Sequence, residues 1–310
     1  MGRSASPSHA DAQLASSEPS TAEAAPDVLS TAPDSENLAR GLSVGVAVDR
    51  EFQRTPEWKA LLETEIASAS AVLAREFRME LKIVGWAEWN SGEAVSSAQQ
   101  LYDRALTVHS SGEIVLVVSG KSLPWGDDGT PPPCGVARYF QKTALVCCAD
   151  ELSQMYLSET ILHEIGHLFG AWHSSDDRSV MRRHPVGESA SWFDPEARAV
   201  LSRFRRIDLL VGVDGLTGRD MEFITGEYRK RHIPGEMHPV AHCLARRAMD
   251  QLKAGELAGA ERAACLALEI SRAATTDDRD GANELSSLIA DIRRRALDSK
   301  QEREPDRDER

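Results

Sequence analysis

Residues 42–48 read LSVGVAV, a short apolar run rich in β-branched residues that predicts a buried strand. Residues 55–57 (TPE) supply an N-cap, a proline at the first helical position and an early acid, which predict an amphipathic helix over 56–76. Apolar and polar residues alternate over 79–89, which predicts a second strand. The continuous apolar run 112–120 predicts a third, central strand. Strands that alternate with helices in this way predict an α/β fold with a twisted, mostly parallel sheet.

Shorter elements continue the alternation. Ser158 is the expected cap of a helix over about 159–169, which follows the last strand. The other expected elements are a helix over 97–108, a Gly- and Pro-rich loop over 120–135, strands over 136–140 and 143–149, and a helix capped by Asp194-Pro195-Glu196.

The two ends of the chain differ from its middle. The N-terminal 40 residues contain almost no large apolar side chains, so they cannot offset their ordering entropy and predict a disordered tail. Apolar residues at helical spacing on both sides of Gly255 predict a helical C-terminal segment. The expected order is therefore a tail (1–40), an α/β (α+β) domain (41–211), a linker (212–237), a helical segment (238–298) and a charged tail (299–310).

Composition excludes some classes of function. The net charge of -13 argues against a general nucleic-acid binder, which needs a basic face, and no apolar run is long enough to span a membrane. Five cysteines without a C-x-x-C pair form no four-cysteine zinc site, although one bridge from Cys134 to Cys147 or Cys148 stays open. Because no signal-peptide core is recognisable, we expect the chain as written to be cytoplasmic; export by another route or an upstream start are the alternatives.

Residues 163–173 read HEIGHLFGAWH and carry the chemistry. Four residues advance an α-helix by about 6 Å and nearly one turn, so His163 and His167 can present two nitrogens to one metal ion. Glu164 lies about 100° further round the helix, where it can hold a water beside the metal. Five specified positions arise by chance in such a chain on the order of once in 10⁴.

The third histidine requires the helix to end. In a continuous helix His173 would lie roughly 15 Å along the axis from His163, too far to share a metal. Gly170 stands between them and accepts the left-handed conformation that ends helices. We therefore expect a positive φ at Gly170 and a loop that returns His173 to the ion. Three imidazoles leave one tetrahedral position open, the pattern of a catalytic Zn²⁺ site.

The motif His163-Glu164-x-x-His167-x-x-Gly170-x-x-His173 resembles the signature of metzincin zinc metallopeptidases. Met181, eight residues after His173, stands where that family has its methionine turn, and this spacing with Ser174 is similar to the matrixin branch. The resemblance covers roughly 42–211. It implies a metzincin-like catalytic domain with an active-site helix, one catalytic Zn²⁺ and a metalloendopeptidase that uses Glu164 as the general base for a zinc-activated water.

Departures from the family are visible as well. Arg183 stands where astacin-like members have a tyrosine ligand, and the loop 120–135 lacks the histidine cluster of the matrixin structural metal sites, with only Asp127 and Asp128 as acids. A divergent metzincin is therefore expected.

The resemblance implies a peptide or protein substrate. An extended substrate would pair with the edge strand 135–140, and residues 182–186 (RRHPV) would line the pocket beyond the scissile bond. Arg182, Arg183 and His184 favour acidic or polar side chains there, unless they are ordinary surface charge.

Alternatives remain open at this stage. His238 and His242, with Cys243, form a second i, i+4 pair that is either a metal site or a helix start with incidental histidines. Glu188 could replace His173 as third ligand in a gluzincin arrangement, and Cys134 could cap the metal as an inhibitory thiolate.

Two further alternatives concern the whole chain. The peptidase-like domain could be catalytically weak and act as an adaptor, binding a protein partner through the helical C-terminus, where residues 253–270 are weakly similar to the centre of a tetratricopeptide repeat. The tail 1–40 could instead cover the cleft of an inactive precursor.

Overall fold

A computed structural model describes residues 39–92, 95–124, 133–184, 187–230, 237–274 and 279–301. The described residues from Ala39 onward belong to one compact unit. The expected disordered tail falls outside the described residues except for its last two positions, and so do Asp127 and Asp128.

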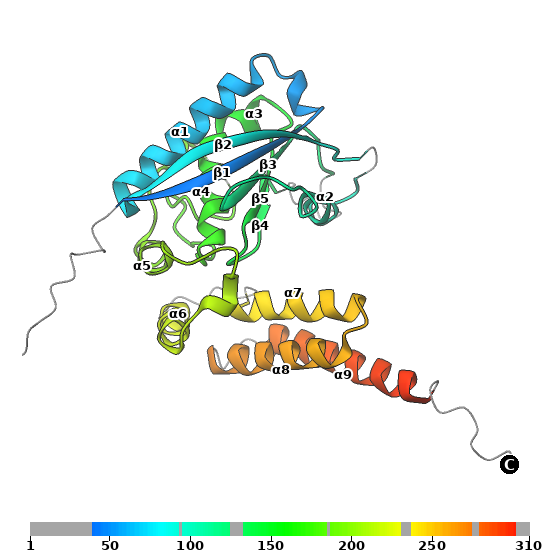
Figure 1. Ribbon diagram of the computed structural model, residues 1–310. Helices are drawn as coiled ribbons and strands as arrows, with labels where there is room; N and C mark the ends of the chain where they lie inside the picture. Colours follow the sequence, from blue (N-terminus) through cyan, green and yellow to red (C-terminus); the bar gives the residue numbers. More distant parts are fainter. Residues whose placement is uncertain are drawn as a thin grey trace, which may run out of the picture. The chain divides into compact units, whose positions relative to one another are not determined.

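A five-stranded sheet forms the centre of the fold, in the order β2-β1-β3-β5-β4 (Figure 1). Neighbouring strands are parallel except for β4, which pairs antiparallel with β5 at one edge. The strands are β1 (Arg40–Asp49), β2 (Met79–Trp89), β3 (Ile114–Ser119), β4 (Gly135–Ala137) and β5 (Thr143–Cys147). The predicted α/β class with a mostly parallel sheet is confirmed.

Helices cover both faces of the sheet. Side chains of α1 (Trp58–Phe77) and α4 (Leu157–Leu168) form one buried cluster with alternate residues of β3 such as Leu116. The other face packs on α2 (Ala98–Ala105), with Val117 turned toward it. Burial on both faces explains why β3 is apolar from Ile114 to Val118.

Two helix starts differ from the prediction. The helix expected from residue 56 begins at Trp58, because Glu57 adopts the left-handed conformation (φ 50°) and is not part of the helix. The 3-10 turn η2 (Phe52–Arg54), in which Phe52 is buried, precedes it. The helix expected to be capped by Ser158 begins at Leu157 instead. A short helix that the prediction missed, α3 (Glu151–Met155), precedes it, and its capping box is formed by Asp150 and Ser153.

The expected strand 136–140 is shorter than predicted. It ends at Ala137 because the amide of Phe140 donates to the carbonyl of Leu168, at the end of α4, and not to a neighbouring strand (3.1 Å). Phe140 adopts φ 54°, a left-handed conformation that a strand cannot contain.

The C-terminal helices pack onto the same core. Val240 and Leu244 join the buried cluster of the sheet and α4, and so do Ile224 and Tyr228. The stretch 212–237, expected as a linker, thus contains a packed helix, and the domain boundaries at 211 and 238 stay predictions. The elements are α5 (Pro195–Phe204), η3 (Gly212–Gly215), α6 (Gly218–Lys230), α7 (Pro239–Lys253), α8 (Leu257–Ala274) and α9 (Arg279–Gln301).

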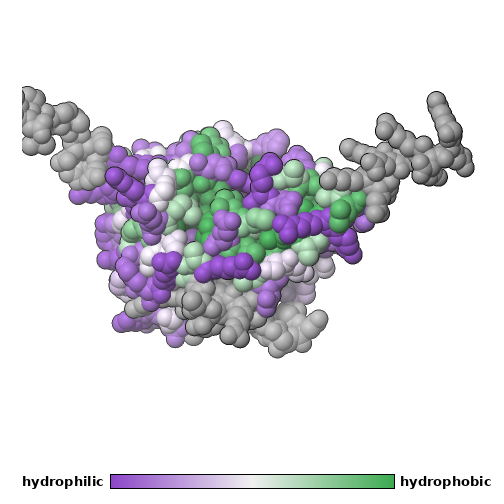
Figure 2. Space-filling model, turned by 90° about the horizontal axis from the view of Figure 1, so that it is seen from below, coloured by the Kyte–Doolittle hydropathy of each residue, from purple (hydrophilic) through white to green (hydrophobic). Residues whose placement is uncertain are grey.

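The predicted helical C-terminal region is confirmed. Figure 2 shows one face of the molecule, on which polar residues surround a central apolar area. Exposed apolar side chains on these helices include Leu266 and Leu297. Within the part of the chain that the structure describes, no helix is both long and apolar enough to span a membrane.

Candidate metal centre

The helix α4 ends where the sequence analysis requires it to end. Its last residue is Leu168, and Gly170 has φ 89°, as predicted. The amide of Ala171 donates to the carbonyl of Gly166 (3.0 Å), which is the long hydrogen bond of a Schellman motif. A Cβ on residue 170 would lie 2.4 Å from the Phe140 ring, so glycine is required here for space as well as for φ.

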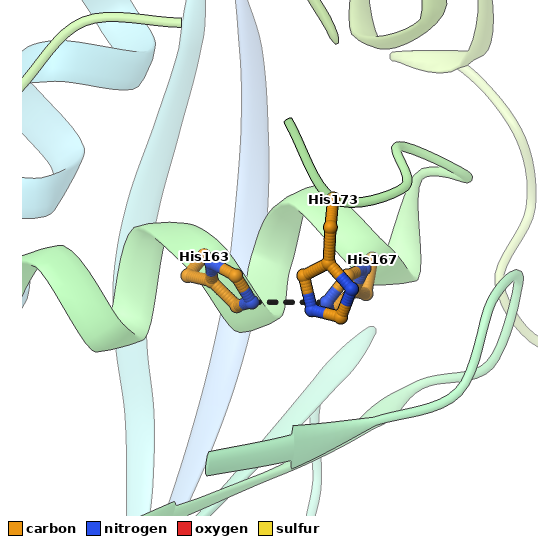
Figure 3. A group of neighbouring side chains, drawn as sticks. All are labelled: His163, His167 and His173. Atoms are coloured by element: carbon orange, nitrogen blue, oxygen red, sulfur yellow. Dashed lines mark hydrogen bonds between the residues drawn. The ribbon is translucent and has the colours of Figure 1, made fainter. Parts of the chain in front are cut away.

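The chain reversal brings the three predicted histidines together. One ring nitrogen of each of His163, His167 and His173 lies within 4.8 Å of the others (Figure 3). The ring centroids of His163 and His167 are 4.6 Å apart, and that of His173 lies 4.9 Å from His167. Among the described residues this is the group of His, Cys, Asp or Glu side chains that could hold a metal ion.

Backbone carbonyls fix the tautomers of the two helical histidines. The Nδ1 of His163 lies 2.8 Å from the carbonyl of Val180, and the Nδ1 of His167 lies 2.7 Å from that of Ala171. A carbonyl only accepts, so both Nδ1 atoms carry the proton in the neutral rings, and both Nε2 atoms present lone pairs. This is the usual arrangement of metal-binding histidines.

The two Nε2 atoms are 3.0 Å apart. Two neutral imidazoles with these tautomers would point lone pairs at each other, which is unfavourable unless a cation lies between them. Two ligand nitrogens at about 2.0–2.1 Å from one tetrahedral zinc ion would be separated by roughly 3.4 Å. Burial and the neighbouring His163 and His173 lower the pKa of His167 well below its usual value, which keeps it neutral as a ligand. The residues therefore fit a divalent metal ion.

Glu164 is buried beside the histidines, with a side chain only 3% exposed. Its Oε2 has no hydrogen-bond partner among the described residues, so it needs a donor from outside the chain, such as a water. Burial raises the pKa of this carboxyl well above its usual value. A Cβ on residue 135 would lie 2.4 Å from Oε1 of Glu164, so Gly135 is what lets the carboxylate approach β4.

The turn that contains Met181, expected from the resemblance to be a methionine turn, packs against α4. Met181 is fully buried, and a Cβ on Gly166 would lie 2.4 Å from its Sδ. The carbonyl of Met181 accepts from the amide of Ser174 (2.7 Å), and the hydroxyl of Ser179 donates to Asp194, the cap of α5 (2.7 Å). The turn is thereby fastened both to the segment after His173 and to the next helix.

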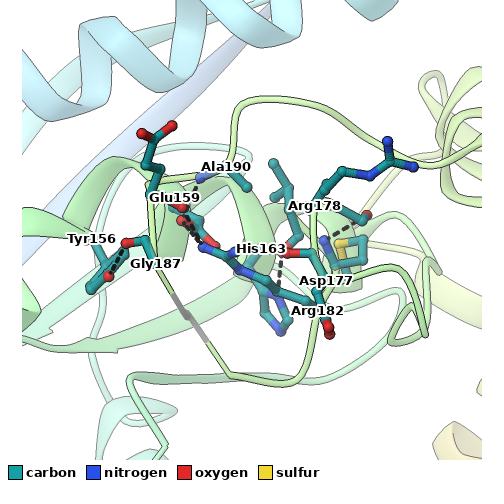
Figure 4. A network of polar contacts seen from close by, with 12 residues as sticks. Tyr156, Glu159, His163, Asp177, Arg178, Arg182, Gly187 and Ala190 are labelled. Atoms are coloured by element: carbon teal, nitrogen blue, oxygen red, sulfur yellow. Dashed lines mark hydrogen bonds and ion pairs between the residues drawn. The ribbon is translucent and has the colours of Figure 1, made fainter.

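A buried ion pair fixes the segment after the turn, and the sequence analysis missed it. Arg182 binds both carboxylate oxygens of Glu159 on α4, at 2.8 and 3.0 Å, and both side chains are almost fully buried (Figure 4). Glu159 also accepts from the amide of Ala190 (2.7 Å), and Arg182 donates to the carbonyls of Asp177 and Glu188. In the sequence, the only sign of this pair is that Glu159 lies one helical turn before His163. No local pattern identifies Arg182 as the partner of Glu159.

This pairing corrects one expectation about specificity. Arg182 was expected to favour acidic or polar substrate side chains, but its charge is neutralised by Glu159. Arg183 and His184 are exposed, whereas Pro185 and Val186 lie outside the described residues.

A cleft of about 690 Å³ opens beside the histidines. Its lining includes Cys134, Gly135, Tyr156 and Thr160. All five cysteines are thiols, so the bridge from Cys134 to Cys147 or Cys148 is not formed. Burial, and then Glu164, raise the pKa of the Cys134 thiol, so it stays protonated in the metal-free chain.

The competing metal sites are not assembled. His238 is the N-cap of α7 and accepts from the amide of Val240 (3.2 Å), so it marks a helix start. Glu188 has an exposed side chain, and the described group contains His173 in its place.

The buried His238 makes stability depend on pH. Burial, and then the nearby charge of Arg229, lower its pKa from 6.5 to about 3. The unfolded chain binds the His238 proton first, so the free energy of unfolding should fall below pH 6.5 by up to about 1.4 kcal/mol per pH unit, down to about pH 3. In the metal-free protein His238→Asn, which keeps a capping acceptor, should lose about 2 kcal/mol less than wild type between pH 6.5 and pH 5 in denaturant titrations. Equal losses would contradict the assignment.

Comparison with solved structures gives low-identity likenesses. Archaemetzincin from Methanopyrus kandleri is 18% identical, with 57% of this chain and 99% of that chain covered at a TM-score of 0.43. A chain from a structure of a chaperone–substrate complex is 14% identical, with 56% of this chain and 35% of that chain covered at a TM-score of 0.38. No family model matches, and no curated protein matches. The chemistry of the site is therefore inferred from its own side chains.

Proposed function

We propose that this chain is a zinc-dependent metalloendopeptidase. The observation that supports the proposal is the geometry of three imidazoles around one point, with the unpartnered carboxylate oxygen of Glu164 beside them. His163, His167 and His173 are the proposed ligands. Three nitrogen ligands leave a position for water or substrate, which a purely structural zinc site does not.

The chain's own groups divide the reaction as follows. A zinc ion, when bound, supplies Lewis acidity that polarises a peptide carbonyl and makes water more acidic. Glu164 accepts the proton of the attacking water and then delivers it to the leaving amine. Its raised pKa suits this exchange, because a carboxyl group that is too acidic does not hold the proton long enough to return it.

The edge strand β4 suits an extended substrate. Among the described residues it pairs with β5 alone, and Gly135 at its start lines the cleft beside Glu164. A peptide that adds to this edge by backbone hydrogen bonds would pass its scissile bond in front of the carboxylate. Backbone pairing of this kind favours a protein or peptide substrate and requires no particular side chain in it.

Metal content tests the proposal. The purified protein should bind one zinc per chain, measured by elemental mass spectrometry, and a strong chelator should abolish casein cleavage that added zinc restores. His173→Ala removes one ligand and should reduce zinc affinity by at least about 100-fold. The matched control is His109→Ala, which alters an exposed histidine and should bind zinc normally. A wild-type protein that binds no divalent metal would overturn the proposal.

The adaptor alternative makes a different prediction for the wild type. A degenerate domain that only binds partners through α7–α9 would retain its folded state and show no chelator-sensitive hydrolysis. Casein cleavage by the wild type therefore separates the two readings.

A further inference from the structure

The C-terminal helix α7 contacts the end of the edge strand right beside a proposed metal ligand. Tyr139, two residues after β4, places its ring between two imidazoles: its centroid lies 5.4 Å from that of His167 and 5.5 Å from that of His242. Both pairs are edge-to-face, with interplanar angles of 89°. His242 belongs to α7, so a single aromatic ring joins this helix to a ligand.

Two further contacts hold α7 at the same place. The thiol of Cys243 donates to the carbonyl of Tyr139 (2.8 Å), and burial raises the pKa of that thiol to about 12, so it remains a donor. The buried Arg138 pairs with Asp103 of α2 (3.0 Å) and lies 3.8 Å from Asp250 of α7. Arg138 and Tyr139 are thus held by residues of α2 and α7, and the Tyr139 ring also contacts His167 of α4.

The same strand end is tied to the active-site helix. Phe140 donates its amide to Leu168, and its ring fills the space beside Gly170. Residues 138–140 therefore lie between the C-terminus of α4 and α7, and both neighbours restrict their movement.

His167 needs such support. Its hydrogen bond to Ala171 fixes the position of Nδ1, and its other ring neighbours, His163 and His173, are themselves proposed ligands. A neighbouring ring packed edge-to-face restricts the tilt of the His167 ring and contributes stabilisation beyond simple burial. Groups that orient a ligand commonly change metal affinity 10- to 100-fold when they are removed.

We propose that Tyr139 and His242 are positioning residues of the metal centre, so that α7 supports His167 through the Tyr139 ring. This inference rests on the proposed function, because it assumes that His167 binds a metal. It assigns the C-terminal helices a role in the site in addition to any partner they bind.

The experiment measures zinc affinity by competition with a chromogenic chelator, together with the visible spectrum of the cobalt-substituted protein. Tyr139→Leu and His242→Ala should each weaken zinc binding about tenfold and shift the cobalt bands, because the His167 ring is less well oriented. Tyr139→Phe keeps the ring and should bind within about threefold of wild type. The control is Lys253→Ala, on the exposed side of α7, which should bind as wild type does.

Hydrogen exchange in the wild type provides a readout that needs no variant. Because coupling between two sites is reciprocal, zinc binding should slow amide exchange in residues 239–253 as well as in α4. The inference would be overturned if Tyr139→Leu and His242→Ala bound zinc as tightly as wild type. It would also be overturned if zinc slowed amide exchange in α4 but not in α7. A wild type that binds no zinc would instead overturn the proposed function.

Discussion

Replacing Glu164 by glutamine should lower the rate of peptide hydrolysis about 10²- to 10⁴-fold while leaving zinc content unchanged. The amide has nearly the shape of the carboxylate, so it fits the space that Gly135 provides, but it cannot take a proton from the attacking water. The ligand nitrogens are not altered. Single-turnover rates on a fluorogenic peptide, with zinc content measured on the same sample, report both quantities.

Because Glu164 is buried, this substitution should not reduce the free energy of unfolding. A neutral amide removes the desolvation cost that raises the pKa of Glu164, so Glu164→Gln should unfold at the same or a higher denaturant concentration than wild type. Its matched comparison is Glu151→Gln, an exposed glutamate on α3, which should keep wild-type activity. If Glu164→Gln were as active as wild type, the carboxylate would not be the base.

The second large effect is on stability. Arg182→Met should reduce the free energy of unfolding by about 3–5 kcal/mol, because it leaves the buried carboxylate of Glu159 without its bidentate partner. The carbonyls of Asp177 and Glu188 lose their donor in the same step. Denaturant unfolding followed by circular dichroism gives the difference.

A double variant separates the charge from the packing. Glu159→Gln combined with Arg182→Met removes the unpaired buried charge of Glu159. The double variant should therefore have a larger free energy of unfolding than Arg182→Met alone. The exposed Arg178, on the same turn and paired with Asp176, is the control, and Arg178→Met should leave the unfolding midpoint unchanged. If Arg182→Met matched this control, the pair would not be holding the segment.

Local patterns predicted the sheet and the helical part of the site well. Burial on both faces makes β3 apolar from Ile114 to Val118, and helical spacing places His163 and His167 together, so both features were visible in the sequence. The break at Gly170 followed from distance alone, since a continuous helix would carry His173 away. Each of these inferences depends on residues close in sequence.

The parts that sequence missed depend on distant partners. Nothing around Glu159 identifies Arg182 as its partner, and nothing around Tyr139 points to a helix one hundred residues later. The sequence predicts a linker where α6 lies, because many residues of this helix are polar. Its two buried side chains, Ile224 and Tyr228, are too few to give a clear helical spacing of apolar residues. The early end of β4 depends on a bond to Leu168 that only the folded chain provides.

The contact between Cys243 and Tyr139 also orders events during synthesis. The two residues are 104 positions apart, and a ribosome that adds about 5–20 residues per second needs about 5–20 s to go from one to the other. The histidine motif at 163–173 is translated within that interval, before α7 exists to cover the strand end. The packing of α7 on residues 138–140 therefore forms only after most of the chain has been made, because Cys243 follows the third proposed ligand, His173, by 70 positions.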